Sequence, residues 1–506
     1  MQLTDFHGPV PIPKVCYEIF VRSFCDSNGD GIGDIRGIIS KLSYLKELGI
    51  EALWLTPVHP SPSYHKYDVR DYYDIEPEYG TLSDFRELMH EAHQLGIAVY
   101  LDLIINHTST LHPWFVEARK NKDSRYRNFY WWKNDAEINM LGIARRETSN
   151  DSQEVYPWHD NGEDSEKYYG LFYKGMPDLN YESAELRQEV ARIINFWLTD
   201  VGVDGFRLDA ARHIYPIWAK ADNCEFWKFF SETIHNARPG AFTVGEVWAE
   251  KEEVAPYFQH INAAFNFDLS FAIQRILVRE KDEDLVAKLI ASYTLFKVSN
   301  PQFVDAIMLT NHDQDRIGSV VNNDERKKKL AASILLTLPG QPYIYYGEEI
   351  GMLGMKPDPH IREPFLWTVQ EDDPEKPSWI EAVFSTLETV KPLSVQQRDQ
   401  NSLFYHYKNL IALKKSRTAL GKVIEPNLLP YALADEQMLA YIRYDEEESF
   451  LIVHNLTSEI KEIDLSQTAF KNILFTSNQA DCHENDIYRL GSYASCIFNT
   501  SPQPAR

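Results

Sequence analysis

Residues 202–213 read GVDGFRLDAARH, an apolar run that ends in a cluster of charges. The run is typical of a buried β-strand, and its cation and carboxylate, Arg207 and Asp209, lie two residues apart. Residues two apart on a strand project from the same face, so both side chains should point from the carboxyl end of the strand. Taken alone, such a pair is as consistent with a structural ion pair as with a functional site.

Around this segment, the chain alternates short β-rich runs with longer helical patterns, which indicates parallel βαβ units. The clearest helix follows Thr81. Thr81 and Asp84, three residues later, together resemble a capping box. Eight β-rich runs are predicted, at residues 15–20, 51–56, 97–105, 203–208, 242–247, 265–269, 304–309 and 342–346. Eight such repeats without a glycine-rich first turn favour an α/β fold of the closed (β/α)8 TIM-barrel type over a doubly wound nucleotide-binding sheet.

Two segments interrupt or follow this alternation. Residues 107–180 are aromatic, charged and irregular, and are too long for an ordinary loop, so we expect a small domain inserted after the third strand. Beyond the barrel, which we place at 1–106 and 181–421, alternating runs at 438–444, 449–455 and 488–498 predict antiparallel strands. Residues 422–506 should therefore form a C-terminal β-sandwich domain.

The composition restricts the partners. With 51 Lys+Arg against 75 Asp+Glu, the formal charge of −24 opposes binding to nucleic acid or to an anionic membrane and suits a neutral ligand. No run of about 18 apolar residues predicts a membrane-spanning helix. The opening Met1–Lys14 lacks the pattern of a secretory signal, and the five cysteines lack metal-binding or disulfide spacing, so we expect a cytoplasmic protein with reduced thiols.

Three carboxylates, Asp209, Glu246 and Asp313, follow predicted strands, and in a barrel of this kind the chemistry lies at the carboxyl ends of the strands. Each alone could be a solvated strand end, but three like charges beside two histidines and an arginine indicate a functional site. The chain has no HxH or HExxH motif, which weakens the alternative of a catalytic metal. The carboxylates instead suit a glycoside hydrolase, in which Arg207 keeps Asp209 ionised and nearby negative charge, including Asp313, keeps Glu246 protonated.

Four motifs, DLIINH (102–107), GFRLDAARH (205–213), GEVW (245–248) and LTNHD (309–313), resemble those of the α-amylase family of glycoside hydrolases (family 13), in the family's order. The resemblance implies that Asp209 is the nucleophile, Glu246 the general acid/base and Asp313 a third catalytic carboxylate that holds the sugar. It implies a retaining reaction, for which the carboxyl groups of Asp209 and Glu246 should lie roughly 5 to 6 Å apart.

The same resemblance implies a set of substrate-binding residues. It assigns an aromatic platform, sugar-binding histidines, a second sugar-binding pair and a basic–histidine pair beyond the cleavage point. These residues are Tyr67, His107, Arg207, Arg212, His213, His312, Asp358 and Arg362. The family usually shows glycine where this chain has Lys66.

Subgroup features favour one substrate class. The segment MPDLN (176–180) resembles the signature of the subgroup intermediate between oligo-1,6-glucosidases and neopullulanases, and Ala210 after the nucleophile favours α-1,4 linkages. We therefore expect an α-amylase type of activity on starch or maltooligosaccharides, with some transglycosylation. An α-glucosidase, an oligo-1,6-glucosidase or a trehalose-forming isomerase of the same family remains the alternative. A non-catalytic barrel, as in amino-acid-transporter heavy chains, would be expected to have a membrane span and to lack the carboxylates, and this sequence shows neither feature.

A calcium ion is implied as a structural cofactor. Residues 26–34, DSNGDGIGD, place oxygen ligands at alternating positions like the first half of a calcium loop, although Gly37 stands where an EF-hand has its glutamate. The alternative is an acidic turn. The family resemblance implies five ligands: Asp26, Asn28, Asp30, the Ile32 carbonyl and Asp34. It suggests a second calcium held by Asn106, Asp178 and the His213 carbonyl.

Overall fold

The computed structural model describes residues 12–148, 154–370, 372–478, 480–483 and 486–500. The predicted absence of a secretory signal concerns residues 1–14, most of which lie outside the described residues.

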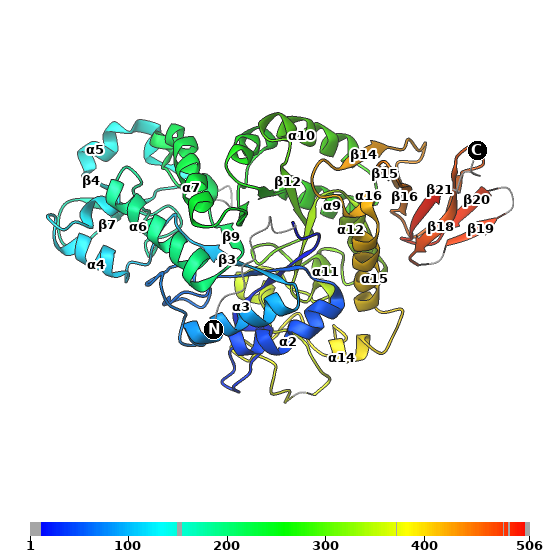
Figure 1. The fold of residues 1–506 in the computed structure, drawn as a ribbon, viewed down its shortest axis with the longest axis horizontal. Helices are drawn as coiled ribbons and strands as arrows, with labels where there is room; N and C mark the ends of the chain where they lie inside the picture. Colours follow the sequence, from blue (N-terminus) through cyan, green and yellow to red (C-terminus); the bar gives the residue numbers. More distant parts are fainter. Residues whose placement is uncertain (1–11, 149–153, 371, 479, 484–485, 501–506) are drawn as a thin grey trace.

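Eight parallel strands close into a barrel in the order β1-β13-β12-β11-β10-β9-β3-β2, which confirms the predicted TIM barrel (Figure 1). The strands are β1 Cys16–Ile19, β2 Ala52–Leu55, β3 Ala98–Leu103, β9 Gly205–Leu208, β10 Phe242–Gly245, β11 Ala263–Phe265, β12 Val304–Met308 and β13 Gln341–Tyr345. Side chains including those of Trp54, Tyr100, Phe265 and Tyr343 fill the interior of the barrel. Because the interior is packed, polar chemistry is confined to the strand ends.

Helices surround the barrel, and local signals fix several of their ends. Helix α2 begins after Asp34, whose side chain accepts a hydrogen bond from the Gly37 N–H, and it ends at Gly49 in the left-handed region (φ 103°). The capping box of Thr81 and Asp84 is present at the start of α3. The helices of the barrel and its loops are α1 Val21–Phe24, α2 Ile35–Leu48, α3 Leu82–Gln94, α6 Ala184–Asn195, α7 Asn223–Ala237, α8 Lys251–Val254, α9 Phe267–Arg279, α10 Leu285–Ser299, α11 Ile317–Val320, α12 Glu325–Thr337, α13 Asp358–Ile361, α14 Leu393–Gln396, α15 Leu403–Ser416 and α16 Thr418–Gly421. A π-helical turn, Phe196–Val201, continues α6.

The sixth strand differs from the prediction. We expected a strand at 265–269, but β11 ends at Phe265, and Asn266 caps α9 by accepting a hydrogen bond from the Leu269 N–H. Helix α10 was not predicted at all. Its apolar residues are not confined to its buried side, since Val298 is 83% exposed, and this hides the helical period.

The segment between β3 and β9 forms small sheets and helices at one end of the molecule (Figure 1). It is joined to the end of β3 by an isolated bridge between His107 and Asp178. Its elements are α4 Pro113–Lys120, α5 Asp135–Met140, β4 Trp132–Lys133, β5 Glu147–Thr148, β6 Glu154–Val155, β7 Trp158–Asp160 and β8 Lys167–Tyr169.

The C-terminal part forms two antiparallel sheets at the opposite end of the molecule (Figure 1), one of five strands and one of three, which share buried side chains. The strands are β14 Asn427–Pro430, β15 Met438–Tyr444, β16 Ser449–Asn455, β17 Lys461–Asp464, β18 Phe470–Thr476, β19 Ala480–His483, β20 Ile487–Leu490 and β21 Ser495–Thr500. The run at 488–498, predicted as one strand, is divided between β20 and β21. The limits proposed for the three domains stay predictions.

Among the residues that the structure describes, no helix combines the length and apolar composition that a membrane crossing requires. Cys16, Cys25 and Cys496 are buried free thiols. The other two cysteines, Cys224 and Cys482, lie outside the residues whose side chains are described.

Candidate active site

The register of three neighbouring strands brings the predicted charged residues together. In the parallel pairing of β3 with β9, Asp102 lies opposite Arg207, and in the pairing of β10 with β9, Val244 lies opposite the same arginine. Asp209 follows the end of β9, and Glu246 follows the end of β10. The two carboxylates are therefore presented side by side at the carboxyl end of the barrel.

Arg207 is the centre of this cluster. Its guanidinium is almost completely buried and donates through Nη1 to Asp102 Oδ1 (2.8 Å) and Asp209 Oδ1 (2.6 Å), while Nη2 lies 2.9 Å from Glu246 Oε2. One buried cation thus contacts three buried carboxylates. Sequence reasoning did not select Asp102 as a site residue, although it opens the DLIINH motif.

Asp313 is held by His312, its neighbour in the sequence, and by Arg362, 49 positions further along the chain. Arg362 Nη2 donates to Asp313 Oδ1 (2.8 Å), and His312 Nε2 lies 3.0 Å from Asp313 Oδ2. Arg362 also contacts Asp358 Oδ2 (3.2 Å), so the structure brings this predicted pair to the site. Burial raises the pKa of Asp313, but the charges of His312 and Arg362 outweigh burial and hold it well below its ordinary value.

Tyr67 connects the two halves of the cluster. Its ring stacks on His312, with centroids 5.5 Å apart and an interplanar angle of 11°. Its hydroxyl lies 3.0 Å from Asp102 Oδ2 and 2.7 Å from His312 Nε2. His107 Nε2 contacts the Tyr67 carbonyl oxygen (3.1 Å), so both residues belong to the same network.

Lys66 stands where the family usually has glycine, and its backbone explains that preference. Its φ of 65° lies in the left-handed region, which glycine adopts most readily. The side chain is buried and places Nζ 3.1 Å from Glu76 Oε2 and 2.9 Å from Glu78 Oε2. This ion-pair cluster offsets the backbone strain and anchors the loop that carries Tyr67.

Arg212 and His213 lie on a short 3₁₀ turn after β9 and make a separate set of contacts. Arg212 Nε donates to Glu253 Oε1 (2.8 Å), and its Nη1 donates to the Trp248 carbonyl oxygen (3.1 Å). The His213 ring is buried, with Nδ1 3.7 Å from Glu147 Oε1. This pair therefore lies beside the main network.

Burial dominates the electrostatics of the central carboxylates. It raises the pKa values of both Asp209 and Glu246, while the Arg207 charge lowers both. For Glu246, we expected neighbouring negative charge to be the main cause; burial is the larger one, and the charges of Asp209 and Asp313 add to it. The Ala210 N–H, from a residue with a φ of 45°, donates to Glu246 Oε2 (3.0 Å) and orients this side chain.

The predicted calcium loop has a compatible donor set. Asp26 is buried and accepts hydrogen bonds from the Gly29 and Gly31 N–H groups (both 2.7 Å), which fold the loop around its carboxylate. The implied ligands offer only oxygen atoms, as Ca²⁺ requires. In the part of the chain that the structure describes, no group of three or more His, Cys, Asp or Glu side chains is arranged to hold a metal, so Asp26, Asp30 and Asp34 do not converge on one point here. The carboxylate of Asp34 instead accepts hydrogen bonds from the Gly37 and Ser27 N–H groups.

The second implied calcium site contains an unpaired polar atom. Asn106 Oδ1 is buried without a hydrogen-bond partner, and Asn106 Nδ2 lies 3.5 Å from Asp178 Oδ2. Burial raises the pKa of Asp178 well above its ordinary value, and the charge of Glu147 raises it further. The sequence did not predict that Glu147 lies near this site, because Glu147 belongs to the irregular inserted segment and to no motif.

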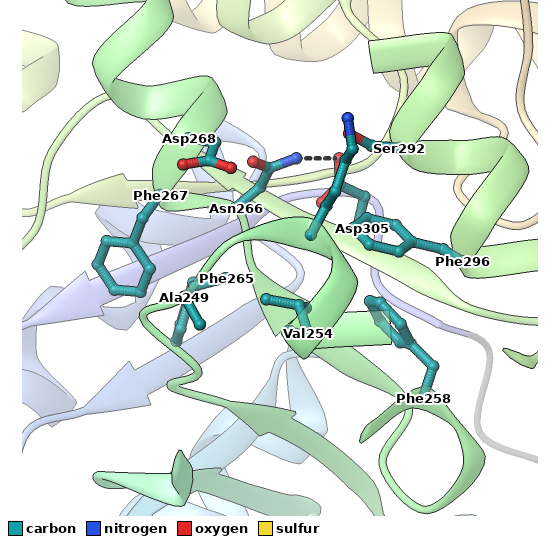
Figure 2. Close-up of a pocket in the computed structure, with 12 residues that line it drawn as sticks. Ala249, Val254, Phe258, Phe265, Asn266, Phe267, Asp268, Ser292, Phe296 and Asp305 are labelled. Atoms are coloured by element: carbon teal, nitrogen blue, oxygen red, sulfur yellow. Dashed lines mark hydrogen bonds between the residues drawn. The ribbon is translucent and has the colours of Figure 1, made fainter. Parts of the chain in front are cut away.

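A small cavity lies apart from these residues, between β11, β12, α8 and α10 (Figure 2). Its volume of about 10 Å³ suits one water molecule and is too small for a sugar. Asn266 donates to Asp305 Oδ2 across it (3.1 Å; Figure 2). None of its lining residues belongs to the carboxylate cluster, so this cavity is not the substrate site.

Comparisons with known proteins match both the barrel and the C-terminal part of the chain. The family model for the α-amylase catalytic domain matches residues 18–422, and the model for the C-terminal domain of the α-amylase SusG matches residues 438–497. A protein named Alpha-amylase 3, from Dictyoglomus thermophilum, is 40% identical over 98% of this chain and 95% of its own length. A 4-alpha-glucanotransferase from Thermotoga maritima is 35% identical over 88% of this chain and 96% of its own.

A solved structure shares the whole architecture. The crystal structure of an α-amylase from H. orenii superposes with a TM-score of 0.86 and 38% identity, covering 96% of this chain and 99% of that one. Both the family model and the relatives extend over most of the chain, and the strand-end motifs lie in the matched region. This chain therefore belongs to the α-amylase family of glycoside hydrolases, family 13, and is a glycoside hydrolase.

Proposed function

We propose that this enzyme cleaves α-1,4-glucosidic bonds in starch or maltooligosaccharides with retention of configuration, as an α-amylase with some transfer activity. The observation that carries the proposal is the shared guanidinium: Arg207 contacts Asp209 through one terminal nitrogen and Glu246 through the other. Two carboxylates held on adjacent nitrogens of one group suit the short separation of a retaining pair.

In the proposed reaction, Glu246 gives its proton to the glycosidic oxygen while Asp209 attacks the anomeric carbon. The glycosidic C–O bond breaks, and a β-linked glycosyl ester forms on Asp209. Glu246 then removes a proton from water, which attacks the same carbon and releases the sugar as the α anomer with Asp209 restored. Asp313, ionised beside Arg362, accepts hydrogen bonds from the sugar hydroxyls.

The test is product analysis on maltooligosaccharides whose non-reducing end is blocked. We expect internal cleavage of the blocked substrates, with the first products detected by proton NMR as α anomers. Failure to cut them, with rapid cleavage of the unblocked substrates, would favour the α-glucosidase or oligo-1,6-glucosidase alternative. β-Anomeric first products would contradict retention.

Transfer is the second activity to measure, because a 4-alpha-glucanotransferase is among the relatives. In transfer, the hydroxyl of a second sugar takes the place of water in attacking the glycosyl ester. We expect products longer than the substrate at high maltooligosaccharide concentration, in addition to hydrolysis. An isomerase would instead rearrange a disaccharide without shortening it.

A bell-shaped pH dependence of kcat/KM follows from the two carboxylates. Asp209 must be ionised, so activity falls as the pH drops through its pKa, which burial raises. Glu246 must be protonated, so activity falls as the pH rises through its pKa, which burial also raises. With an activated aryl glycoside, which needs little acid assistance in the first step, Glu246→Gln should abolish the alkaline limb and keep the acid one; an unchanged alkaline limb would contradict the role of Glu246.

We also propose that Asp26, Asn28, Asp30, the Ile32 carbonyl and Asp34 hold a structural Ca²⁺, and that Asn106, Asp178 and the His213 carbonyl hold a second. When bound, the ion supplies a charge that fixes these loops and takes no part in bond cleavage.

Chelation should reveal the first of these ions. EDTA should lower the melting temperature. Calcium added at about 100 times its Kd should then raise the free energy of unfolding by about 2.7 kcal/mol. Asp30→Ala should reduce that restoration because exposed Asp30 supplies a ligand. Asp123→Ala, at another exposed aspartate, should leave it unchanged. Equal calcium responses in both variants would contradict a site at residues 26–34.

A further inference from the structure

Glu18 lies on β1, outside the motifs that mark the site, and its side chain is 1% exposed. Its Oε1 lies 2.6 Å from His312 Nδ1 and 3.4 Å from the His312 backbone nitrogen. These two residues are 294 positions apart in the chain. A carboxylate buried this completely requires a charged or hydrogen-bonding partner, and the His312 ring provides it.

Both nitrogens of the His312 ring face oxygen atoms. Nδ1 faces Glu18, while Nε2 lies 3.0 Å from Asp313 Oδ2 and 2.7 Å from the Tyr67 hydroxyl oxygen. The Tyr67 hydroxyl has one proton, which it can donate to Asp102 Oδ2 at 3.0 Å. If it does so, the Tyr67 oxygen is an acceptor toward His312, and both ring nitrogens must carry hydrogen to satisfy their neighbours.

We propose that Glu18 is a positioning residue that keeps His312 doubly protonated, so that His312 Nε2–H holds Asp313 in place for the substrate. This inference rests on the proposed function for the role of Asp313. Glu18 touches neither the substrate nor the reacting carboxylates in this account; it acts through the imidazolium. A glutamine at this position could accept the same hydrogen bond but would supply no charge.

The other groups around His312 are consistent with a charged ring. Burial lowers its pKa, but the carboxylates of Asp313 and Glu18 outweigh burial and raise it to about 10. Burial raises the pKa of Glu18, and the charges of His312 and Arg207 oppose that rise. Three further residues lie around His312. The Tyr67 hydroxyl donates to Asp102, and the centroid of the Trp54 ring lies 5.5 Å from that of the His312 ring. Arg362 Nε donates to the His312 carbonyl oxygen (2.9 Å).

The direct test is the protonation state of His312, followed by ¹⁵N NMR of the histidine side chains, with His312→Gln used to assign the signal. In the wild-type enzyme, the ring should remain an imidazolium at pH 8. In Glu18→Gln, the midpoint of its titration should fall by about one to three pH units. A neutral ring in the wild type at pH 7, or an unchanged midpoint in Glu18→Gln, would overturn the proposal.

The kinetic test uses the same variant. Glu18→Gln should shift the alkaline limb of kcat/KM toward lower pH, since His312 would lose its proton, and release Asp313, at a lower pH than in the wild type. The decrease in kcat/KM should be small at pH 6. Glu349→Gln is a matched control: Glu349 is equally buried but bonds to Tyr17 (2.8 Å) and Tyr44 instead of a histidine. Glu349→Gln should leave both the alkaline limb of kcat/KM and the titration midpoint of His312 unchanged. A pH-independent loss in Glu18→Gln would mean a structural role only and would overturn the proposal.

The NMR measurement requires no turnover, so it separates this inference from the proposed function. If Asp209→Asn kept full activity, the proposed mechanism would fail while the His312 titration could still follow Glu18. If the His312 ring were neutral while Asp209→Asn was inactive, the present inference alone would fail. If Glu18→Gln does not fold, a neutral His312 ring in the wild-type enzyme at pH 7 to 8 would still overturn the proposal.

Discussion

Replacement of Asp209 by asparagine is expected to lower kcat/KM on maltooligosaccharides by a factor on the order of 10⁴. The amide is too weak a nucleophile to form the glycosyl ester, although it keeps the shape of the side chain. The folded structure should persist, because Arg207 retains two other carboxylate partners, Asp102 and Glu246. The measurement is the initial rate of product release, with circular dichroism as a check on folding.

Azide rescue of smaller variants distinguishes the nucleophile from the acid/base. In Asp209→Gly, azide should occupy the space of the missing carboxylate and attack an activated α-glucoside directly, giving the β-glucosyl azide. In Glu246→Gly, azide should attack the glycosyl ester on Asp209, giving the α-glucosyl azide after two inversions. The opposite pairing of variant and product would exchange the two roles, and full activity of Asp209→Asn on every α-glucoside would refute the mechanism.

Replacement of Arg207 by methionine should have the largest effect on stability. Its guanidinium, 1% exposed, contacts Asp102, Asp209 and Glu246, so its removal leaves three buried carboxylates without their shared cation. The loss of one partner from a buried ion cluster costs about 3 to 5 kcal/mol. Urea unfolding at pH 7 should show a loss of this size, together with loss of activity.

The pH dependence of that loss identifies its cause. Without Arg207, burial would raise the pKa values of the three carboxyl groups in the folded state further above their values in the unfolded chain. The folded protein would then bind more protons than the unfolded chain, so the stability of the variant should fall, relative to the wild type, as the pH rises. The difference should be smaller at pH 5 than at pH 8. An equal loss at both values would indicate lost packing of the long side chain instead.

Much of the fold could be predicted because its signals are local. Helix α3 begins at its predicted capping box, since the residues of such a cap lie within one turn of one another. Where the local signal was ambiguous, prediction failed. The short alternation of apolar and polar residues at 265–269 resembles a strand, but the Asn266 cap divides this segment between β11 and α9.

The candidate site was predictable to the extent that its residues lie in motifs. Asp209, Glu246 and Asp313 each follow a strand of their own, and strand ends meet at one face of a barrel. Glu18 could not be selected in this way because it lies outside the motifs, and Asp102 was not selected although it opens one. Each is a polar residue within a buried strand, and its role depends on a partner that no short-range pattern identifies.

By itself, the sequence determined the barrel, the family, and which carboxylates lie at strand ends, because strand periodicity, helix caps and motifs are written in neighbouring residues. Only the tertiary structure decided how those groups are paired. The strand register places Arg207 against Asp102, 105 residues away, and closure of the barrel places Glu18 against His312, 294 residues away. Burial, which decides the charges of these groups, arises only once the distant strands have come together.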